Sequence, residues 1–313
     1  MSELISCPIC EKESSSFLFS TRRFNNNYLI AKCRKCSLVY VNPQPTLSEL
    51  NSHYSKNYNY SYMQKSAPSK NDKKDAEILE KMKKSNCSSL LDVGCGSGLF
   101  VLSAKKHGFK AKGIDLSQKM ISYGKNKFNL DLSIKDFLKM NEKFDNITMR
   151  HFLEHTKNPS QCIKKAKSLL KKDGLLFIKV PNIESFAFSI SGKRWNWLSP
   201  PAHLFFFSPK TITKLLEKQG FTIRKIETRR GDSESLLFHL GISIADKLGL
   251  WNYLKEKKDR EQKDSQPDNA ESSITPIINN LGIILSPIEY LLNKSRRGSE
   301  LVVYASPIAK ENS

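Results

Sequence analysis

Several features that would place this chain of 313 residues among membrane or secreted proteins are missing. No apolar run reaches the length of a transmembrane helix. The opening segment, "MSELISCPIC", has no apolar stretch typical of a secretion signal. No internal repeat is present either. We therefore expect a cytoplasmic globular protein with one large α/β domain and one small domain.

Acidic residues are also scarce, because 31 Asp and Glu stand against 51 Lys and Arg, for a formal net charge of +20. Such a surface would attract nucleic acid or an anionic membrane. However, the lysines are spread along the whole chain, as in "KKDAEILEKMKK" and "IKKAKSLLKKDG". This spread is typical of solvated helix faces, so a nucleic-acid partner is not favoured.

The seven cysteines do not form the pattern of a disulfide framework. Cys7 and Cys10 form one Cys-x-x-Cys unit, Cys33 and Cys36 form another, and 22 residues separate the two. Two such units supply four thiolates for one tetrahedral ion, and zinc in a closed structural site is the expected occupant. An iron–sulfur or redox role is the less favoured alternative. The spacing predicts a zinc-ribbon module over residues 1–45, with a β-hairpin between the two units.

Strand-like and helix-like stretches alternate from residue 89 to about 230, which indicates a mostly parallel sheet covered by helices on both faces. Strands are expected at "SLLDVG", "KAKGIDLS", "LDLSIKDF", "FDNITMRH", "LLFIKVPN", "FTIRKIETR" and "SELVVYASP", and helices at "LFVLSAKKHG", "QKMISYGKNKF", "SQCIKKAKSLLKKDG" and "SPKTITKLLEKQG". We therefore expect a helical linker over 46–85 and an α/β domain over 86–313. Residues 235–297 break the alternation and are interpreted as an insertion.

The segment "LLDVGCGSGLF" joins the first of these strands to the first helix. Gly94, Gly96 and Gly98 leave the backbone bare and permit positive φ, while the following helix presents free N–H groups. Asp115 ends the next strand, where a carboxylate can accept both hydroxyls of a ribose. Strand, glycine loop, helix, strand and acid in this order predict a nucleoside-binding site.

The spacing of the glycines distinguishes between two classes of nucleoside cofactor. A dinucleotide fingerprint reads GxGxxG and binds a pyrophosphate, whereas this loop reads DxGxGxG and places Asp92 at the strand end. That carboxylate would repel phosphate but suits a ligand with a sulfonium and an ammonium group. The pattern therefore favours S-adenosylmethionine.

With these motifs the chain resembles the class I S-adenosylmethionine-dependent methyltransferases, and in "FDNITMRHFLEHTKNP" the subgroup of ubiquinone-biosynthesis O-methyltransferases. The resemblance implies a Rossmann-like sheet of seven strands, the last one antiparallel. It also implies that Asp92 and the three glycines line the methionine end of the cofactor, that Asp115 binds the ribose, and that Asp136 and Phe137 contact the adenine. A helix cap is the alternative role for Asp136. The predicted cofactor-binding residues further include Cys95, Leu116 and Arg150.

The loop after the fourth strand carries the candidate catalytic residues His151, Glu154 and His155, which one helical turn would place on one side. His151 or His155 would act as a general base for an acceptor that must lose a proton. A divalent metal is a second interpretation, but the resembling enzymes carry Glu-x-x-Glu-His, and His151 replaces the first Glu. A third is that Glu154 and His155 only form the wall of the cofactor site.

The segment "GKRWNWLSPPAHLFFFSPKT" is aromatic, rich in proline and too irregular for a predicted strand. Trp195, Trp197, Phe205 and His203 would line an acceptor pocket under a rigid lid, or would simply pack over the sheet edge. His203 is the second candidate for the base. The remaining cysteines, Cys87, Cys95 and Cys162, are expected to be small buried residues.

Two absences narrow the acceptor. No Asn/Asp-Pro-Pro-Tyr follows the fourth strand, which argues against methylation of adenine or glutamine nitrogen, and no Pro-Cys pair stands there for a covalent pyrimidine mechanism. The sequence thus predicts a methyltransferase acting on O, N or C of a small molecule or sugar. An RNA methyltransferase and a non-catalytic cofactor-binding and zinc-binding protein are the alternatives. Residues 235–297 would cap the domain, contact a partner subunit or touch a membrane surface.

Overall fold

The computed structural model describes residues 3–23, 26–57, 72–83, 88–231, 247 and 291–308. The chain divides into two compact units. The larger comprises Met1–Pro181, Ser199–Ile226 and Leu301–Ser313, and the smaller comprises Asn182–Leu198 and Glu227–Glu300. The cysteine module and the predicted cofactor loop therefore belong to the same unit.

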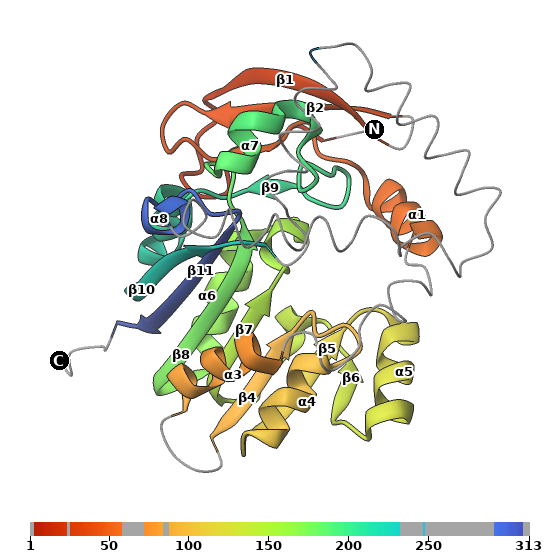
Figure 1. Cartoon of the computed structure of the whole chain (residues 1–313). Coiled ribbons are helices and arrows are strands. Elements are labelled where there is room, and N and C mark those ends of the chain that lie inside the picture. The colour runs from red at the N-terminus through yellow and green to blue at the C-terminus, as the bar shows by residue number, and fades with distance from the viewer. Residues whose placement is uncertain are drawn as a thin grey trace. The chain divides into compact units, whose positions relative to one another are not determined.

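The larger sheet has seven strands (Figure 1). Their spatial order is β10 (Phe221–Arg229), β11 (Glu300–Pro307), β8 (Leu170–Pro181), β7 (Phe144–Arg150), β4 (Ser89–Val93), β5 (Lys110–Asp115) and β6 (Leu132–Ile134). The pairs β4–β5, β4–β7, β5–β6 and β7–β8 are parallel. From β4 the chain therefore first adds β5 and β6 on one side of β4, and later adds β7 and β8 on the other side. In open α/β sheets, ligands bind at such a reversal in the crevice beyond the carboxyl ends of the strands, so we expect the cofactor there.

Helices bury both faces of this sheet. On one face, α3 (Asp72–Met82) and α4 (Leu99–Lys106) share an apolar cluster with Phe177 of β8 and Tyr304 of β11. On the other, α6 (Pro159–Leu169) and α8 (Pro209–Lys218) pack with Ile178, the residue next to Phe177. Because successive residues of a strand face opposite sides, both faces contribute to the core. Helix α5 (Gln118–Phe128) packs at β6 through Ile121 and Leu132.

The smaller sheet has the order β1-β2-β3-β9. Strands β1 (Ser15–Arg23) and β2 (Asn26–Cys33) form the hairpin expected between the two Cys-x-x-Cys units, and they pair antiparallel. Strand β3 (Val39–Val41) follows the second Cys-x-x-Cys unit, and α1 (Leu47–Asn57) comes next in the chain. The fourth strand, β9 (Phe205–Phe206), comes from the other end of the chain and pairs with β3. The module is therefore completed by a segment of the α/β domain.

Most of the predicted elements are present, and two predictions are wrong. The segment 204–208 was considered too irregular for a strand, yet β9 forms because β3 offers it an open edge. The helix expected over 160–174 ends at Leu169, and β8 begins at Leu170. Leu170 pairs with Phe144 of β7 and is buried, so tertiary packing overrides the local helix propensity.

Among the described residues, no helix combines the length and apolar character needed to cross a bilayer. The predicted insertion over 235–297 lies outside the described residues except for 247 and 291–297, and so does Cys87. The smaller unit includes two short helices, α7 (Phe186–Ser191) and the 3₁₀ turn η4 (Gly192–Arg194).

Candidate active site and cysteine cluster

The glycine loop follows β4 and has the backbone that its sequence requires. The φ angles are 72° at Gly94, 54° at Gly96 and 79° at Gly98, all in the left-handed region. A Cβ at Gly98 would lie 2.9 Å from the side chain of Leu132, and one at Gly94 would lie 3.0 Å from Phe152. Side chains are therefore excluded here both by conformation and by close neighbours.

Asp115, the last residue of β5, fixes the shape of this loop. Its Oδ2 accepts a hydrogen bond from the Gly96 amide at 2.9 Å, and its Oδ1 accepts one from the Ser117 amide at 2.8 Å. The carboxylate is only half-buried, so it has lone pairs left for a ligand. The Asp115 carboxylate, which is predicted to bind the ribose, is thus held in position by the backbone before a cofactor binds.

Apolar side chains lie next to this carboxylate. Leu116 is 77% exposed, and Ile134, which pairs in register with Asp115 on β6, is 50% exposed. Large apolar residues exposed beside a polar anchor are typical of a site that stacks a flat ligand. Leu116 was among the predicted residues, whereas Ile134 was missed because its strand has only three residues.

The predicted adenine residues lie at the turn η2 (Phe137–Lys139). Asp136 is exposed and caps this turn by accepting a hydrogen bond from the Leu138 amide at 2.9 Å. Phe137 is buried, and its ring meets that of Phe152 edge-on at 6.1 Å. Phe152 therefore contacts both Phe137 and the Gly94 backbone, a wall position that the sequence pattern did not reveal.

A charged cluster lies at the carboxyl ends of β4 and β7. Asp92 is buried and accepts a hydrogen bond from the Thr148 hydroxyl at 2.6 Å. Burial raises the pKa of Asp92 to about 6, although the nearby Arg150 guanidinium opposes this shift. Arg150 pairs with Asp75 of α3 at 3.4 Å, and its guanidinium stacks over the Phe100 ring at 4.2 Å.

The Arg150 guanidinium is incompletely satisfied. Its Nε and Nη1 atoms are buried, and neither makes a hydrogen bond among the described residues. Two carboxylates and one guanidinium in a low-dielectric setting leave an excess of negative charge beside the glycine loop. This arrangement suits a ligand that carries both cationic groups and a carboxylate.

Cys95 lies within the loop, but its side chain points at β5. Its sulfur lies 2.7 Å from the position that a Cβ on Gly113 would occupy. Burial raises the pKa of the Cys95 thiol, which keeps it protonated and poorly nucleophilic. Cys95 thus packs the loop against the sheet. Cys162 is likewise buried, as predicted.

The loop after β7 brings the predicted catalytic residues together. His151 adopts a φ of +49°, which is uncommon for a residue with a Cβ. Its Nδ1 lies 3.2 Å from Oε1 of Glu154, at the turn η3 (Leu153–His155). The His151 side chain is 27% exposed and that of Glu154 is fully buried. A partly exposed imidazole is therefore backed by a buried carboxyl group.

Glu154 is held in its ionised form. Burial alone would raise the pKa of this carboxyl group, but the hydrogen bond with His151 and the fields of His155, His151 and His203 outweigh it. The resulting pKa is about 2. The second oxygen, Oε2, is buried and makes no hydrogen bond among the described residues.

His155 and His203 form the inner part of this cluster. Nδ1 of His155 lies 2.9 Å from the Ala202 carbonyl oxygen, and the two imidazole rings meet edge-on at 4.6 Å. A carbonyl oxygen can only accept, so Nδ1 of His155 carries the proton. Burial lowers the pKa of His155, which keeps it neutral near pH 7. Burial also lowers the pKa of His53 on α1, with a smaller contribution from repulsion by His155.

The predicted aromatic patch divides between the two units. Phe205 is buried within β9 of the larger unit. Trp195 is fully buried in the smaller unit, where its ring packs on that of Phe188 at 5.4 Å. Trp197 belongs to the smaller unit as well. Trp195 and Phe205 therefore contribute to packing within their own units.

The four cysteines of the N-terminal module converge. The Sγ atoms of Cys7 and Cys36 are 3.4 Å apart, as are those of Cys10 and Cys33, and all four lie within 4.8 Å of one another. All but Cys10 are buried. The hydrogen bond with Cys7 lowers the pKa of Cys36 to about 5. Four converging sulfurs, three of them from buried residues, match the donor set of a closed tetrahedral site.

Comparison with known proteins assigns the family. The family described as "Methyltransferase domain" matches residues 62–226, which is more than half of the chain. The chain belongs to this methyltransferase family. Together with the seven-stranded sheet, the match confirms the prediction of a class I S-adenosylmethionine-dependent methyltransferase fold and activity.

Two curated relatives carry the name ubiquinone biosynthesis O-methyltransferase. The protein of Pelagibacter ubique is 31% identical over 167 residues, which cover 49% of this chain and 70% of that protein. The protein of Coxiella burnetii is 31% identical over 151 residues, which cover 44% of this chain and 64% of that one. Among solved structures, a SAM dependent methyltransferase from Archaeoglobus fulgidus has a TM-score of 0.49 at 17% identity, covering 79% of this chain and 99% of that chain. The assignment of this methyltransferase therefore rests on the sequence matches.

The first prediction for this methyltransferase concerns Asp115. Asp115→Ala should weaken S-adenosylmethionine binding by about tenfold or more, because the ribose loses charge-assisted hydrogen bonds and the loop loses its anchor at Gly96. Calorimetric titration measures the affinity, with Asp131→Ala, at an exposed aspartate at the start of β6, as the matched control. Equal affinity in the two variants would remove Asp115 from the cofactor site.

The second prediction concerns pH and Asp92. The pKa of Asp92 is raised from 3.8 to about 6 in the empty protein, so its ionisation destabilises the fold. This destabilisation is absent below pH 3.8, grows as pH rises towards 6, and reaches up to about 3 kcal/mol above it. A bound sulfonium and ammonium would favour the ionised form. S-adenosylmethionine affinity should therefore fall as the pH drops from 7.5 to 5.5.

Asp92→Asn is the matched variant for this test, since its amide oxygen can still accept the Thr148 hydrogen bond. We expect the variant to bind the cofactor more weakly, to show no pH dependence between 5.5 and 7.5, and to raise the free energy of unfolding of the empty protein at pH 7.5. Chemical denaturation and calorimetry measure both quantities. A wild-type affinity that is constant over this pH range would contradict the prediction.

Proposed function

We propose that this methyltransferase deprotonates a small-molecule acceptor with His151, while Glu154 orients the imidazole. The observation that carries the proposal is the 3.2 Å contact between His151 Nδ1 and the fully buried carboxylate of Glu154. A histidine backed by a buried carboxylate is a recurrent arrangement for a general base. Here it stands at the carboxyl end of β7, on the crevice side of the sheet.

The ionised Glu154 determines which nitrogen of His151 can act as a base. Oε1 can only accept a hydrogen bond, so Nδ1 of His151 carries the proton and Nε2 keeps its lone pair. The pKa of Glu154 near 2 keeps this arrangement over the whole physiological pH range. The left-handed backbone of His151 and the hydrogen bond from its amide to the Lys179 carbonyl at 2.8 Å fix the position of the ring. Nε2 is therefore the acceptor for the proton of the substrate.

S-adenosylmethionine supplies a methyl carbon activated by the sulfonium, so much of the rate comes from alignment. In the transfer, the acceptor atom would bond to the methyl carbon while the carbon–sulfur bond breaks, and the electrons of that bond would stay on sulfur. The proton of the acceptor passes to Nε2 of His151 and later to water. The buried His203 and the partly buried His155 act in this proposal as the wall that orients the acceptor.

The proposed cofactor-binding site is formed by the residues that the sequence predicts to bind S-adenosylmethionine. The bare backbone at Gly94, Gly96 and Gly98 would lie along the cofactor, and Asp115 would bind the ribose. Phe137 and the edges of Leu116 and Ile134 would enclose the adenine, with Asp136 near its amino group. Support for the methionine end comes from the charged cluster, where the carboxylates of Asp92 and Asp75 outnumber the single guanidinium of Arg150 and the buried Nε of Arg150 makes no hydrogen bond among the described residues.

The acceptor is proposed to be a small molecule with an ionisable hydroxyl, as the name of the curated relatives suggests. The chain spans about two thirds of the length of those relatives, so their name does not fix the acceptor of this chain. A sugar acceptor therefore stays within the proposal. Peripheral membrane contact through 235–297 would suit a lipid-linked acceptor. RNA is less favoured, because the positive charge is spread over the chain.

We further propose that the four cysteines hold one structural zinc ion. Three of the four are buried and their sulfurs converge, which fits a closed site that leaves no position for a substrate. The hairpin β1–β2 accommodates the 22 residues between the two Cys-x-x-Cys units. Thiols kept free for a metal fit a reducing compartment, which supports the cytoplasmic location.

His151→Gln provides the test of the base. It should keep S-adenosylmethionine affinity within about twofold but lower kcat by about a hundredfold or more, because the proton has no acceptor. Transfer of tritiated methyl groups is measured with a polyprenyl catechol, a nucleotide sugar and total RNA as separate acceptors. His107→Gln, at the partly buried residue that caps the carboxyl end of α4, is the matched control. A His151→Gln variant as active as wild type would rule out the base.

The same assay separates the base from a metal at the histidines. Glu154, His155 and His203 place ligand atoms within 4.8 Å of one another. If the reaction depended on a metal there, added divalent ions would raise the rate and a chelator would lower it. We expect neither effect on the chemical step of protein whose structural zinc is intact.

Elemental analysis tests the zinc proposal. The purified chain should contain about one zinc ion, and Cys33→Ser should lower this content and the midpoint of thermal unfolding together, because a structural zinc site contributes folding free energy. Cys162→Ser, at a buried thiol outside the cluster, is the control that should keep the metal. Metal-free protein with the same unfolding midpoint would exclude the site.

A further inference from the structure

We infer that the four-cysteine cluster positions His155 and His203 of the acceptor side. It does so through β9 and through the loop Cys7–Cys10. This inference builds on the proposed function, because it concerns the wall of the same site. It gives the N-terminal module a role in the active site, although the module lies more than 100 residues before His155 and His203 in the sequence. His155 and His203 are the residues positioned, and the module acts on them through backbone pairing.

The first connection runs through the small sheet. Cys33 and Cys36 bracket a tight turn, in which the Cys33 amide donates to the Leu38 carbonyl at 2.9 Å. The next residues form β3, where Val39 pairs with Phe206 and Tyr40 with Phe205. The second cysteine pair is thus linked directly to β9.

Strand β9 begins two residues after His203. The Val41 amide donates to the Leu204 carbonyl at 2.9 Å, and the Leu204 amide donates to the Glu154 carbonyl at 2.7 Å. Leu204 therefore joins the cysteine module to the catalytic loop. On its amino-terminal side, the Ala202 carbonyl accepts the proton of His155 Nδ1 at 2.9 Å. A shift of β9 would move the His203 ring and the acceptor of His155 together.

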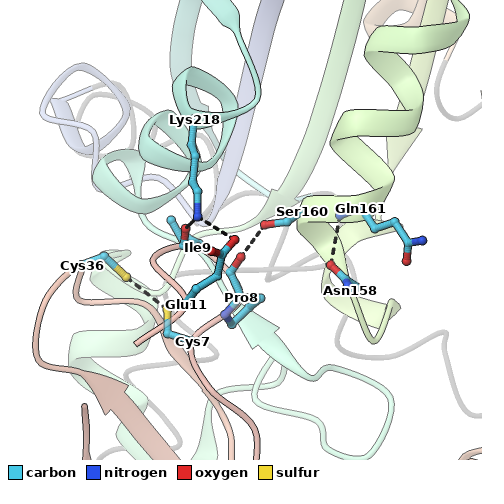
Figure 2. A network of polar contacts seen from close by, with 9 residues as sticks. All are labelled: Cys7, Pro8, Ile9, Glu11, Cys36, Asn158, Ser160, Gln161 and Lys218. Carbon is cyan, nitrogen blue, oxygen red and sulfur yellow. Dashed lines mark hydrogen bonds and ion pairs between the residues drawn. The ribbon is translucent and has the colours of Figure 1, made fainter. Parts of the chain in front are cut away.

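The second connection runs through the first cysteine pair (Figure 2). The Pro8 carbonyl accepts a hydrogen bond from Ser160 in the first turn of α6. Lys218, at the end of α8, donates to the Ile9 carbonyl at 2.8 Å and to Glu11 at 2.8 Å. The loop between Cys7 and Cys10 is therefore bound to two helices of the α/β domain.

Helix α6 begins directly after the histidine loop. Its cap is Asn158, which accepts from the Gln161 amide at 3.0 Å and stands three residues after His155 (Figure 2). Ser160 lies within the same turn. The contact of Pro8 with Ser160 therefore fixes the carboxyl end of the segment that carries His155, while β9 fixes the partner of its imidazole.

Packing makes these connections stiff. Cys7, Cys33 and Cys36 belong to the same apolar cluster as Leu153 and Leu204. Interiors of this density transmit displacement, because a side chain cannot move without moving its neighbours. Four thiolates without a cation repel one another, so a bound metal would keep the two loops, and through them the histidines, in place.

Cys10→Ser tests the inference, since Cys10 is the least buried of the four cysteines. The protein is saturated with S-adenosylhomocysteine, and nitrogen-15 spectra of its histidines report which ring nitrogen carries the proton. We expect zinc to fall below about one half per chain, and the Nδ1–H form of His155 to lose its dominance. Affinity for S-adenosylhomocysteine should stay within about threefold, because the glycine loop is anchored by Asp115 of β5 and not by the cysteine module.

Three controls make the outcome specific. Cys10→His supplies a different zinc ligand and should restore both the metal and the wild-type spectrum of His155. Phe17→Ala, at a side chain that is 64% exposed on β1, alters the module outside the proposed connections and should change neither. His107, whose Nδ1 lies 2.8 Å from the Ser103 carbonyl in α4, is the internal reference that would shift only on general unfolding.

If Cys10→Ser does not fold, the double variant Ser160→Ala with Lys218→Met gives the same test. It keeps all four thiols and removes the hydrogen bonds of the first cysteine loop to α6 and α8. Zinc should stay at one ion per chain while the His155 signals shift. Unchanged His155 and His203 signals in every folded variant would overturn the inference. No methyl acceptor is used, so this result is independent of the His151→Gln test of the proposed function.

Discussion

The proposed acceptor side of this protein depends on one buried carboxylate. Glu154 has no exposed surface, yet the pKa near 2 shows that its surroundings stabilise the charge. A buried charge of this kind needs charged or hydrogen-bonding partners, because burial alone would neutralise it. His151 provides the hydrogen bond to the carboxylate, and the positive charge that His155, His151 and His203 acquire at low pH opposes protonation of Glu154. The backbone carbonyl of Glu154 accepts a separate hydrogen bond from the Leu204 amide. The ring of histidines and the β9 segment are therefore arranged around a single side chain.

Buried charge also distinguishes the two ends of the proposed crevice, because their surroundings shift carboxyl pKa values in opposite directions. On the cofactor side, carboxylates are in excess, and burial raises the pKa of Asp92 towards neutrality. On the acceptor side, imidazoles are in excess, and they lower the pKa of Glu154. One end thus suits cationic groups, while the other suits a group that must release a proton. These opposite environments lie on neighbouring parallel strands, β4 and β7, whose carboxyl ends share one edge of the sheet.

The sequence was most informative where chemistry and local conformation coincide. The three loop glycines require positive φ and the carboxylate that follows them ends a strand, so the conformation of the glycine loop and the positions of Asp115 and of the strands along the chain were predictable. Phe152 and Ile134 were not, because an apolar residue next to a loop has no local signal for the ring or backbone it will contact. Strand β9 was missed for a related reason. Two phenylalanines after a proline-rich stretch form a strand only when the edge of β3 lies beside them, and that edge is more than 160 residues away in the sequence.

One backbone angle has a consequence for the evolution of this protein. His151 holds a left-handed conformation with a φ of +49°, at a position where glycine would fit without strain. For a residue with a β-carbon, such a conformation costs about 1 kcal/mol or more. Selection for thermal stability alone would favour glycine there. Histidine at this position therefore lowers the stability of the turn, and it places an imidazole beside Glu154 in the proposed site. Homologues that have lost activity but still fold should be the first to carry glycine at this position.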